Sequence, residues 1–171
     1  MGSDLCKRHL SNLNELLIKF KQAPKEVKGI RSTTWFQIGE DIFKEFFKVG
    51  SSVEWQLYKI KNYIEVSDIC QQIETNIDWL ESFITLYPNF CIDLDLVGSA
   101  DNVCQVRSGI DVLLKGFKDI NSQFDRVLQD LNEKGEVDEF DRCLKLWLET
   151  GHRPEFVERS STISEEHWWW F

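Results

Sequence analysis

The chain has 171 residues, of which 42% are apolar and 29% charged, and it carries a formal net charge of −9 at pH 7. This composition indicates one soluble globular domain, and its acidic balance argues against a general nucleic-acid-binding protein. Because we find neither a run of 18 uncharged apolar residues nor a charged-then-apolar leader, we expect no membrane insertion, no secretion and a location in the nucleus or cytoplasm.

Apolar residues recur at alternating spacings of three and four in nearly every segment, a pattern that predicts an all-α protein. The first predicted helix begins near Ser3 and ends before Pro24. A basic connector over residues 25–31 follows it, and Ser32 then caps a second helix that ends at Gly50. The predicted buried stripe of the first helix comprises Cys6, Leu10, Leu13, Leu17 and Phe20.

The second predicted helix is the most heavily apolar segment of the chain. Side-by-side aromatic residues at Trp35/Phe36 and Phe46/Phe47 widen its apolar arc beyond a narrow stripe. Regular seams of this kind either form the internal core of a bundle or are shared with a partner helix. We expect most seams to be core, and this helix to offer a partner-binding face.

Two further helices are predicted before a central loop. A helix from about Ser52 is expected to bury one apolar stripe, and Ser67 with Asp68 suggests a cap, where the chain kinks or runs on into a fourth helix. Pro88 and Asn89 are expected to end that helix. The predicted stripe of the third helix comprises Val53, Leu57, Ile60 and Ile64.

The longest predicted helix spans residues 103–131, where apolar residues keep the alternating spacing over four unbroken heptads. It follows a loop at 88–101 and precedes a last helix over 137–148 that stops at Gly151. We therefore predict, over residues 1–151, an elongated antiparallel helical bundle of about six helices with coiled-coil-like long helices, whose seams allow homo- or hetero-oligomers.

Residues 152–171 form a polar, acidic tail that ends in an aromatic cluster and lacks helical periodicity. Two interpretations are open: the aromatics fold back to complete the core, or they form a peptide that docks into another protein. Trp168 and Phe171 are similar to the W-x-x-F motifs that engage clathrin-adaptor appendage domains, so an adaptor in membrane traffic is the alternative function. The cluster comprises Trp168, Trp169, Trp170 and Phe171.

The sequence contains no motif for catalysis, metal binding or cofactor binding. The five Cys form no C-x-x-C pair, the three His have no obvious carboxylate or thiol partner at an orienting spacing, and no phosphate-binding glycine motif occurs. We therefore predict no catalytic residues, no metal and no cofactor. A small helical enzyme is the remaining alternative to a non-enzymatic protein.

One segment, residues 113–148, carries a set of residues that ends in a distinctive Trp-Leu pair. The set comprises Leu113, Leu114, Phe117, Lys118, Val127, Leu131, Gly135, Asp138, Leu144, Trp147 and Leu148, with Pro154 and Phe156 following. It resembles the C-terminal region of the cyclin-dependent kinase 2-interacting protein family. The resemblance implies a helical adaptor, nuclear and cytoplasmic, that associates with a AAA+ ATPase complex in ribosome maturation and genome maintenance and contacts cell-cycle kinases.

Pattern and resemblance together predict an adaptor or scaffold subunit of a larger complex. It is expected to bind protein partners and to make no direct contact with nucleic acid. The residues expected to bind partners are Trp35, Phe36, Phe46, Phe47, Trp147, Trp168, Trp169, Trp170 and Phe171.

Overall fold

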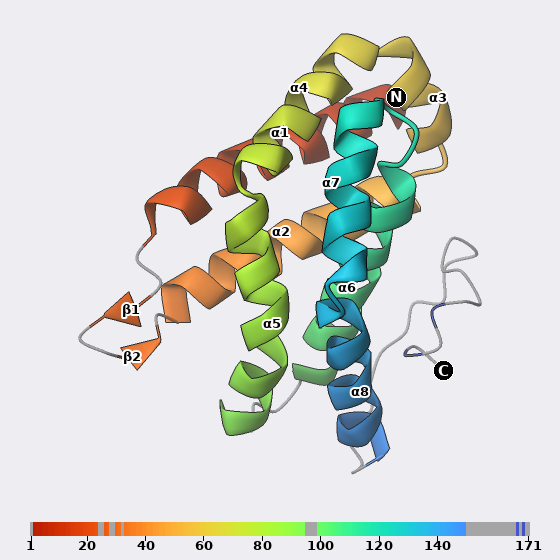
Figure 1. The fold of residues 1–171 in the computed structure, drawn as a ribbon. Helices are drawn as coiled ribbons and strands as arrows, with labels where there is room; N and C mark the ends of the chain where they lie inside the picture. Colours follow the sequence, from red (N-terminus) through yellow and green to blue (C-terminus); the bar gives the residue numbers. More distant parts are fainter. Residues whose placement is uncertain are drawn as a thin grey trace.

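The computed structural model describes residues 2–23, 26–27, 30–31, 33–94 and 99–149, together with His167 and Trp169 (Figure 1). The predicted all-α architecture is confirmed for these residues. One pair of two-residue strands, β1 (Glu26–Val27) and β2 (Ile30–Arg31), pairs antiparallel within the predicted connector. The helices are α1 (Gly2–Gln22), α2 (Thr33–Ser51), α3 (Trp55–Lys61), α4 (Tyr63–Thr75), α5 (Ile77–Leu94), α6 (Ser99–Asp111), α7 (Ser122–Glu133) and α8 (Glu136–Glu149).

Helices α1, α2 and α8 form where the sequence predicts them. The apolar stripe predicted for α1 is buried along its whole length, and the stripe of α8 is buried too, although Leu146 on the same helix is exposed. Helix α1 ends at Gln22, two residues before Pro24, because proline lacks the N–H that a continuing helix needs. The 3.6-residue periodicity therefore located these three helices and the side that each one buries.

The hydrophobic core gathers around Phe83 of α5, which has no exposed surface. The centroid of its ring lies 5.4 Å from that of Phe43 and 4.7 Å from that of Tyr87. Phe20 approaches it edge-on and stacks on Trp35 with a centroid distance of 4.9 Å. Burial of rings of this size dominates core energetics, so α1, α2 and α5 are held together mainly by aromatic packing.

Helix α6 crosses α2 at a contact where only glycine fits. A Cβ atom at Gly109 would overlap the carbonyl group of Phe43. A Cβ atom at Gly39 would overlap the ring of Phe83 in the same way. The missing side chains thus allow α2 to lie against both α5 and α6.

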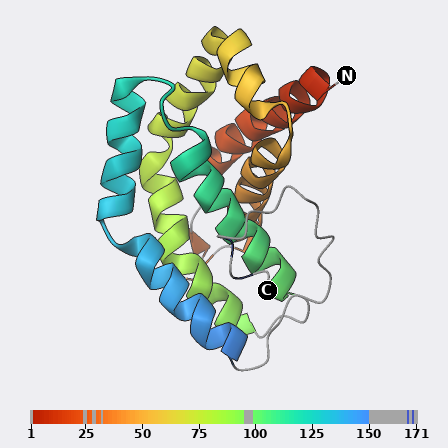
Figure 2. The same cartoon turned by 90° about the vertical axis from the view of Figure 1, so that its right-hand side faces the viewer.

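The prediction of one continuous helix over 103–131 is wrong. Helix α6 is followed by a π-helical turn, η1 (Val112–Gly116), and the chain then reverses into α7 (Figure 2). Asp119 in the turn has a left-handed backbone with φ of 67°. The side chain of Asn121 accepts a hydrogen bond of 2.8 Å from the N–H of Phe124 and so caps α7. The heptad spacing of the apolar residues continues across the turn because α6 and α7 both bury their apolar side in the same core.

The predicted end of a helix at Pro88 is also wrong, because α5 continues through this residue to Leu94. The ring of Pro88 is buried, and this burial offsets part of the lost backbone hydrogen bond. Of the loop predicted at 88–101, residues 95–98 lie outside the described residues, and the rest is helical.

The breaks that bound α4 lie at two asparagines, not at the predicted cap of Ser67 and Asp68, which lies inside that helix. Asn62 separates α3 from α4, and Asn76 separates α4 from α5. The side-chain amide of Asn76 donates to the carbonyl of Gln72 at 2.8 Å. Asparagine is suited to such breaks because its short polar side chain satisfies backbone groups at a helix end.

Helices α5 and α8 lie side by side and run in the same direction, whereas α6 runs against both (Figures 1 and 2). The rings of Tyr87 and Phe140 join α5 to α8 with a centroid distance of 6.4 Å. The described helices therefore include a parallel pair, and their arrangement departs from the purely antiparallel bundle of long helices that the sequence suggested.

Candidate functional site

Five large apolar side chains on α3, on the start of α4 and just before α3 point away from the core. We call them the α3–α4 apolar face: Val53 is 87% exposed, Leu57 54%, Ile60 75%, Tyr63 51% and Ile64 79%. Four of them are the stripe that the sequence predicted to be buried, so that prediction is wrong. Both views place this elbow at one end of the molecule (Figures 1 and 2). Exposed apolar side chains grouped in this way mark interaction sites.

The opposite side of α3 is fixed to the bundle by its own aromatic residues. The indole N–H of Trp55 donates to the carbonyl of Gly116 at 3.0 Å, and its ring lies 4.9 Å from that of Phe117. The ammonium group of Lys59 lies 5.8 Å from the centroid of the same indole and also donates to Gly116, at 3.3 Å. Burial lowers the pKa of Lys59 below its ordinary value.

Tyr58 completes the anchoring of α3. It is buried, and its hydroxyl donates to the carboxylate of Glu65 at 2.8 Å. Burial and this hydrogen bond raise the pKa of Tyr58, so the phenol stays a neutral donor at physiological pH. Because these contacts set the rotation of α3, the apolar face is exposed by a well-packed arrangement rather than by loose packing.

The α3–α4 elbow also contains a surface hollow of about 540 Å³. Its lining mixes apolar, polar and charged side chains: Lys61, Asn62, Tyr63, Ile64, Glu65 and Asp68. An apolar centre beside a polar, charged rim is the usual composition of a protein–protein interface. The local chemistry therefore suits a protein partner that has an apolar centre of its own.

A second cluster joins the end of the chain to α6. The indole N–H of Trp169 donates to the hydroxyl of Ser108 at 3.0 Å, and the guanidinium of Arg107 lies 4.5 Å from the centroid of the Trp169 rings. The thiol of Cys104 donates to the carbonyl of Trp169 at 3.3 Å. His167 stacks on Trp169 with a ring-centroid distance of 4.5 Å. We call Cys104, Arg107, Ser108 and Asp111 the α6 cluster.

Ser108, His167 and Asp111 form a hydrogen-bonded chain of the residue types that hydrolases use. The Oγ atom of Ser108 lies 3.1 Å from Nδ1 of His167, and Nε2 of His167 lies 2.8 Å from Oδ2 of Asp111. However, Ser108 has no exposed surface, and its oxygen already accepts the indole N–H of Trp169. A substrate carbonyl has no path to this hydroxyl, so the chain of bonds serves to hold Trp169 in place.

Asp111 is the charged end of this chain of bonds. Burial opposes its ionisation, but the hydrogen bond from His167 and the ammonium of Lys115 at 3.2 Å outweigh that effect and lower the pKa of Asp111. The carboxylate is therefore charged at neutral pH and is available as an acceptor for the imidazole.

The aromatic residues that the sequence proposed for partner binding lie mainly in the core. Trp35, Phe36, Phe46, Trp147 and Trp169 are buried, and Phe47 is partly buried against the core. In this arrangement these side chains present little surface, whereas the α3–α4 apolar face is exposed, and we take that face as the candidate site. Trp168, Trp170 and Phe171, including both ends of the W-x-x-F motif, lie outside the described residues.

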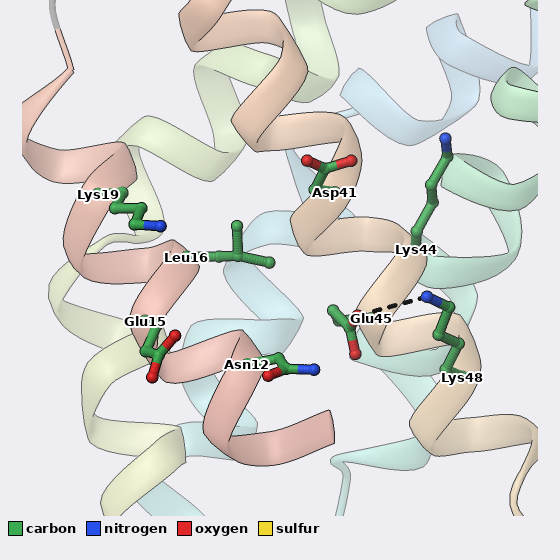
Figure 3. Close-up of a pocket in the computed structure, with 8 residues that line it drawn as sticks. All are labelled: Asn12, Glu15, Leu16, Lys19, Asp41, Lys44, Glu45 and Lys48. Carbon is green, nitrogen blue, oxygen red and sulfur yellow. Dashed lines mark hydrogen bonds and ion pairs between the residues drawn. The ribbon is translucent and has the colours of Figure 1, made fainter. Parts of the chain in front are cut away.

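A smaller hollow of about 240 Å³ lies between α1 and α2 (Figure 3). Its charged residues neutralise one another: Glu45 accepts from Lys48 at 3.4 Å and lies 2.8 Å from Nδ1 of His9. The Glu45–Lys48 pair lies within α2, whereas the contact between His9 and Glu45 joins α1 to α2, and partly exposed contacts of this kind stabilise a fold modestly. We interpret this hollow as structural.

The described residues contain no group of three or more His, Cys, Asp or Glu side chains arranged to hold a metal ion. Burial raises the pKa of both Cys70 and Cys104 to about 12. These two thiols are therefore protonated at neutral pH and are poor nucleophiles. No helix within the described part of the chain combines the length and the apolar character needed to cross a bilayer.

Comparison of the chain with protein-family models, with curated proteins and with solved structures finds no match. The site described above therefore rests on the geometry of this chain alone.

Proposed function

We propose that this chain is a non-enzymatic adaptor subunit that binds a protein partner through the α3–α4 apolar face. The observation that carries the proposal is the exposure of five large apolar side chains on helices that are otherwise firmly packed. Full burial of such a side chain contributes about 1.5 to 3 kcal/mol, so covering this face supplies on the order of 5 to 10 kcal/mol. That energy is comparable to the cost of association, and contacts at the polar rim then decide the partner.

The spacing of the face favours a helix as the binding element of the partner. Val53, Leu57, Ile60 and Ile64 follow one another at intervals of four, three and four residues. Leu57 and Ile60 lie on α3, Val53 lies just before this helix and Ile64 lies on the first turn of α4, so the face follows the elbow instead of one straight seam. We therefore propose that an apolar helix of the partner packs across this elbow.

The class of partner comes from the resemblance of residues 113–148 to the cyclin-dependent kinase 2-interacting protein family. We propose a AAA+ ATPase complex of ribosome maturation and genome maintenance as the assembly, with cell-cycle kinases as further partners and the nucleus and cytoplasm as the location. The segment forms η1, α7 and α8, which lie apart in sequence from the apolar face. We propose that residues 113–148 form part of the bundle's framework, and that the α3–α4 apolar face contacts the partner.

Replacing Ile60 and Ile64 together by Glu is expected to abolish partner recovery without unfolding the chain. Both side chains are at least three-quarters exposed, so their replacement changes stability little, whereas two charges at the centre of an apolar interface weaken binding at least about 100-fold. The measurement is affinity purification from the native source with the full chain, followed by identification of stoichiometric partners.

The matched control is the pair Ile18→Glu and Leu146→Glu, which places charges on exposed apolar residues of α1 and α8. This control should retain the partner, and circular dichroism should show that both double variants melt near the wild-type temperature. Equal recovery by the Ile60/Ile64 variant, or equal loss by the control, would refute the proposed site.

A further inference from the structure

The α6 cluster has the properties of a peptide-docking site. Its four members lie at positions 104, 107, 108 and 111 and so occupy one side of a single helix. The guanidinium of Arg107 is held by the carboxylate of Asp141 on α8 through two bonds, of 2.6 and 3.1 Å, independently of the terminus. The surface that receives His167 and Trp169 is therefore built by α6 and α8 themselves.

The contacts that His167 and Trp169 make with the α6 cluster can be supplied by the same residues of another copy of the chain. Two side chains and one carbonyl, those of His167 and Trp169, make every contact described between the terminus and the α6 cluster. None of these contacts depends on whether the terminus belongs to the same chain. A neighbouring copy can satisfy the same donors and acceptors with the same geometry.

The connection between the bundle and the terminus is long enough for exchange between copies. Helix α8 ends at Glu149, and the 17 residues 150–166 separate it from His167. Seventeen residues span at most about 60 Å, whereas a domain of this length has a radius of gyration of about 16 Å. The terminus of one copy can therefore reach the α6 cluster of another.

We propose that the α6 cluster is a docking site for His167 and Trp169 of a second copy of this chain, which gives a dimer by exchange of termini. Within one chain the tether holds the terminus near its own site at an effective concentration of the order of millimolar. Micromolar wild-type protein is therefore monomeric. Exchange between copies is favoured when the local concentration of the chain is high, as in a multi-subunit assembly. It is also favoured when substitutions prevent a chain from docking its own terminus.

The test mixes two full-length variants that are defective in complementary ways. The site variant, Ser108→Ala with Asp111→Ala, keeps its terminus but loses the two side-chain oxygens that accept hydrogen bonds from it. The terminus variant, His167→Ala with Trp169→Ala, keeps a vacant α6 cluster. Neither can dock its own terminus, but the mixture contains one intact site and one intact terminus.

Sedimentation of the equimolar mixture at about 100 µM is expected to show a 1:1 heterodimer, while each variant alone stays monomeric. The control replaces the site variant by a chain that carries all four substitutions, and this mixture should bind at least about 100-fold more weakly. A mixture that stays monomeric, or a control that dimerises equally, would overturn the proposal.

If the site variant folds poorly, the binding of a peptide to the α6 cluster is measured instead. A labelled peptide of residues 163–171 should bind the terminus variant at least about tenfold more tightly than wild type, whose site is filled by its own terminus. Equal binding to the two proteins would overturn the proposal. Both outcomes concern self-association, so they are independent of whether the α3–α4 apolar face binds its partner.

Discussion

Phe83→Ala is expected to lower the free energy of unfolding by about 4 kcal/mol, the largest effect of any single truncation considered for this chain. Phe83 is fully buried, and its ring packs against Phe43, Tyr87 and Phe20, which belong to three different helices. Removing the ring leaves a cavity that the surrounding aromatics cannot fill without leaving their rotamers. Urea denaturation monitored by circular dichroism measures the change.

The control for this prediction is Phe83→Leu, which keeps most of the buried volume and should cost less than half as much. The slope of the unfolding free energy against urea should be the same for all three proteins, since the surface exposed on unfolding is nearly unchanged. If the alanine and leucine variants are equally stable, Phe83 is not the centre of the core.

Gly109→Ala is expected to lower the free energy of unfolding by about 3 kcal/mol, although it adds only one methyl group. The new Cβ atom would overlap the carbonyl of Phe43, which is backbone of α2 and has no rotamer to change. Relief requires α2 and α6 to move apart, and this separation weakens packing along the whole contact. Thermal and urea denaturation of the variant measure the loss.

Gly135→Ala is the control for Gly109→Ala, because it adds the same methyl group at a position with open space around it. Gly135 has a left-handed backbone with φ of 83°, and no atom lies within 4 Å of an added Cβ. Its replacement should cost about 1 kcal/mol, from backbone strain alone. If Gly109→Ala costs no more than Gly135→Ala, the contact between α2 and α6 is looser than the structure describes.

Local periodicity was sufficient to predict where most of the chain is helical, but not which side of a helix is covered. Helix α3 illustrates the difference, because it has an aliphatic stripe through Leu57 and Ile60 and an opposite side with Trp55 and Tyr58. The aliphatic stripe continued the spacing of neighbouring segments, so we expected it to be buried. The structure buries the aromatic side, because the indole of Trp55 meets a carbonyl 61 residues away.

The signal that was missed is the pair of aromatics at spacing three, Trp55 and Tyr58, opposite the aliphatic stripe. A short helix that is apolar on both sides either lies inside a protein or leaves one side for a partner. At the elbow between α3 and α4 one of the two apolar sides is exposed, as the second alternative requires. Recognition of two competing stripes would have identified the apolar face as a candidate surface from the sequence.

The break in the long heptad segment was unpredictable for a different reason. A heptad pattern is satisfied equally by one straight helix and by two helices that bury the same positions in one core. After α6 and η1, a turn at Asp119 and a cap at Asn121 start α7, and single polar residues of this kind also occur within helices. The tertiary core, not local preference, selected the reversal.

No periodic pattern pointed to the contact between the α6 cluster and His167 and Trp169. Ser108 and His167 are 59 residues apart, and the interval between them includes two helices and the polar tail. The sequence left open whether the terminal aromatics are core or docking peptide. For Trp169 the structure supports the first interpretation within one chain, while the contacts that hold it are ones that a second copy is able to reproduce.

Site-specific photo-crosslinking measures whether the α3–α4 apolar face contacts the proposed partner. A photoreactive amino acid at position 60, on the face, is compared with one at position 18, on an exposed apolar residue of α1. A strong crosslink to a single stoichiometric partner is expected from position 60, and none is expected from position 18. A partner that crosslinks from position 18 and not from position 60 would contradict the proposal.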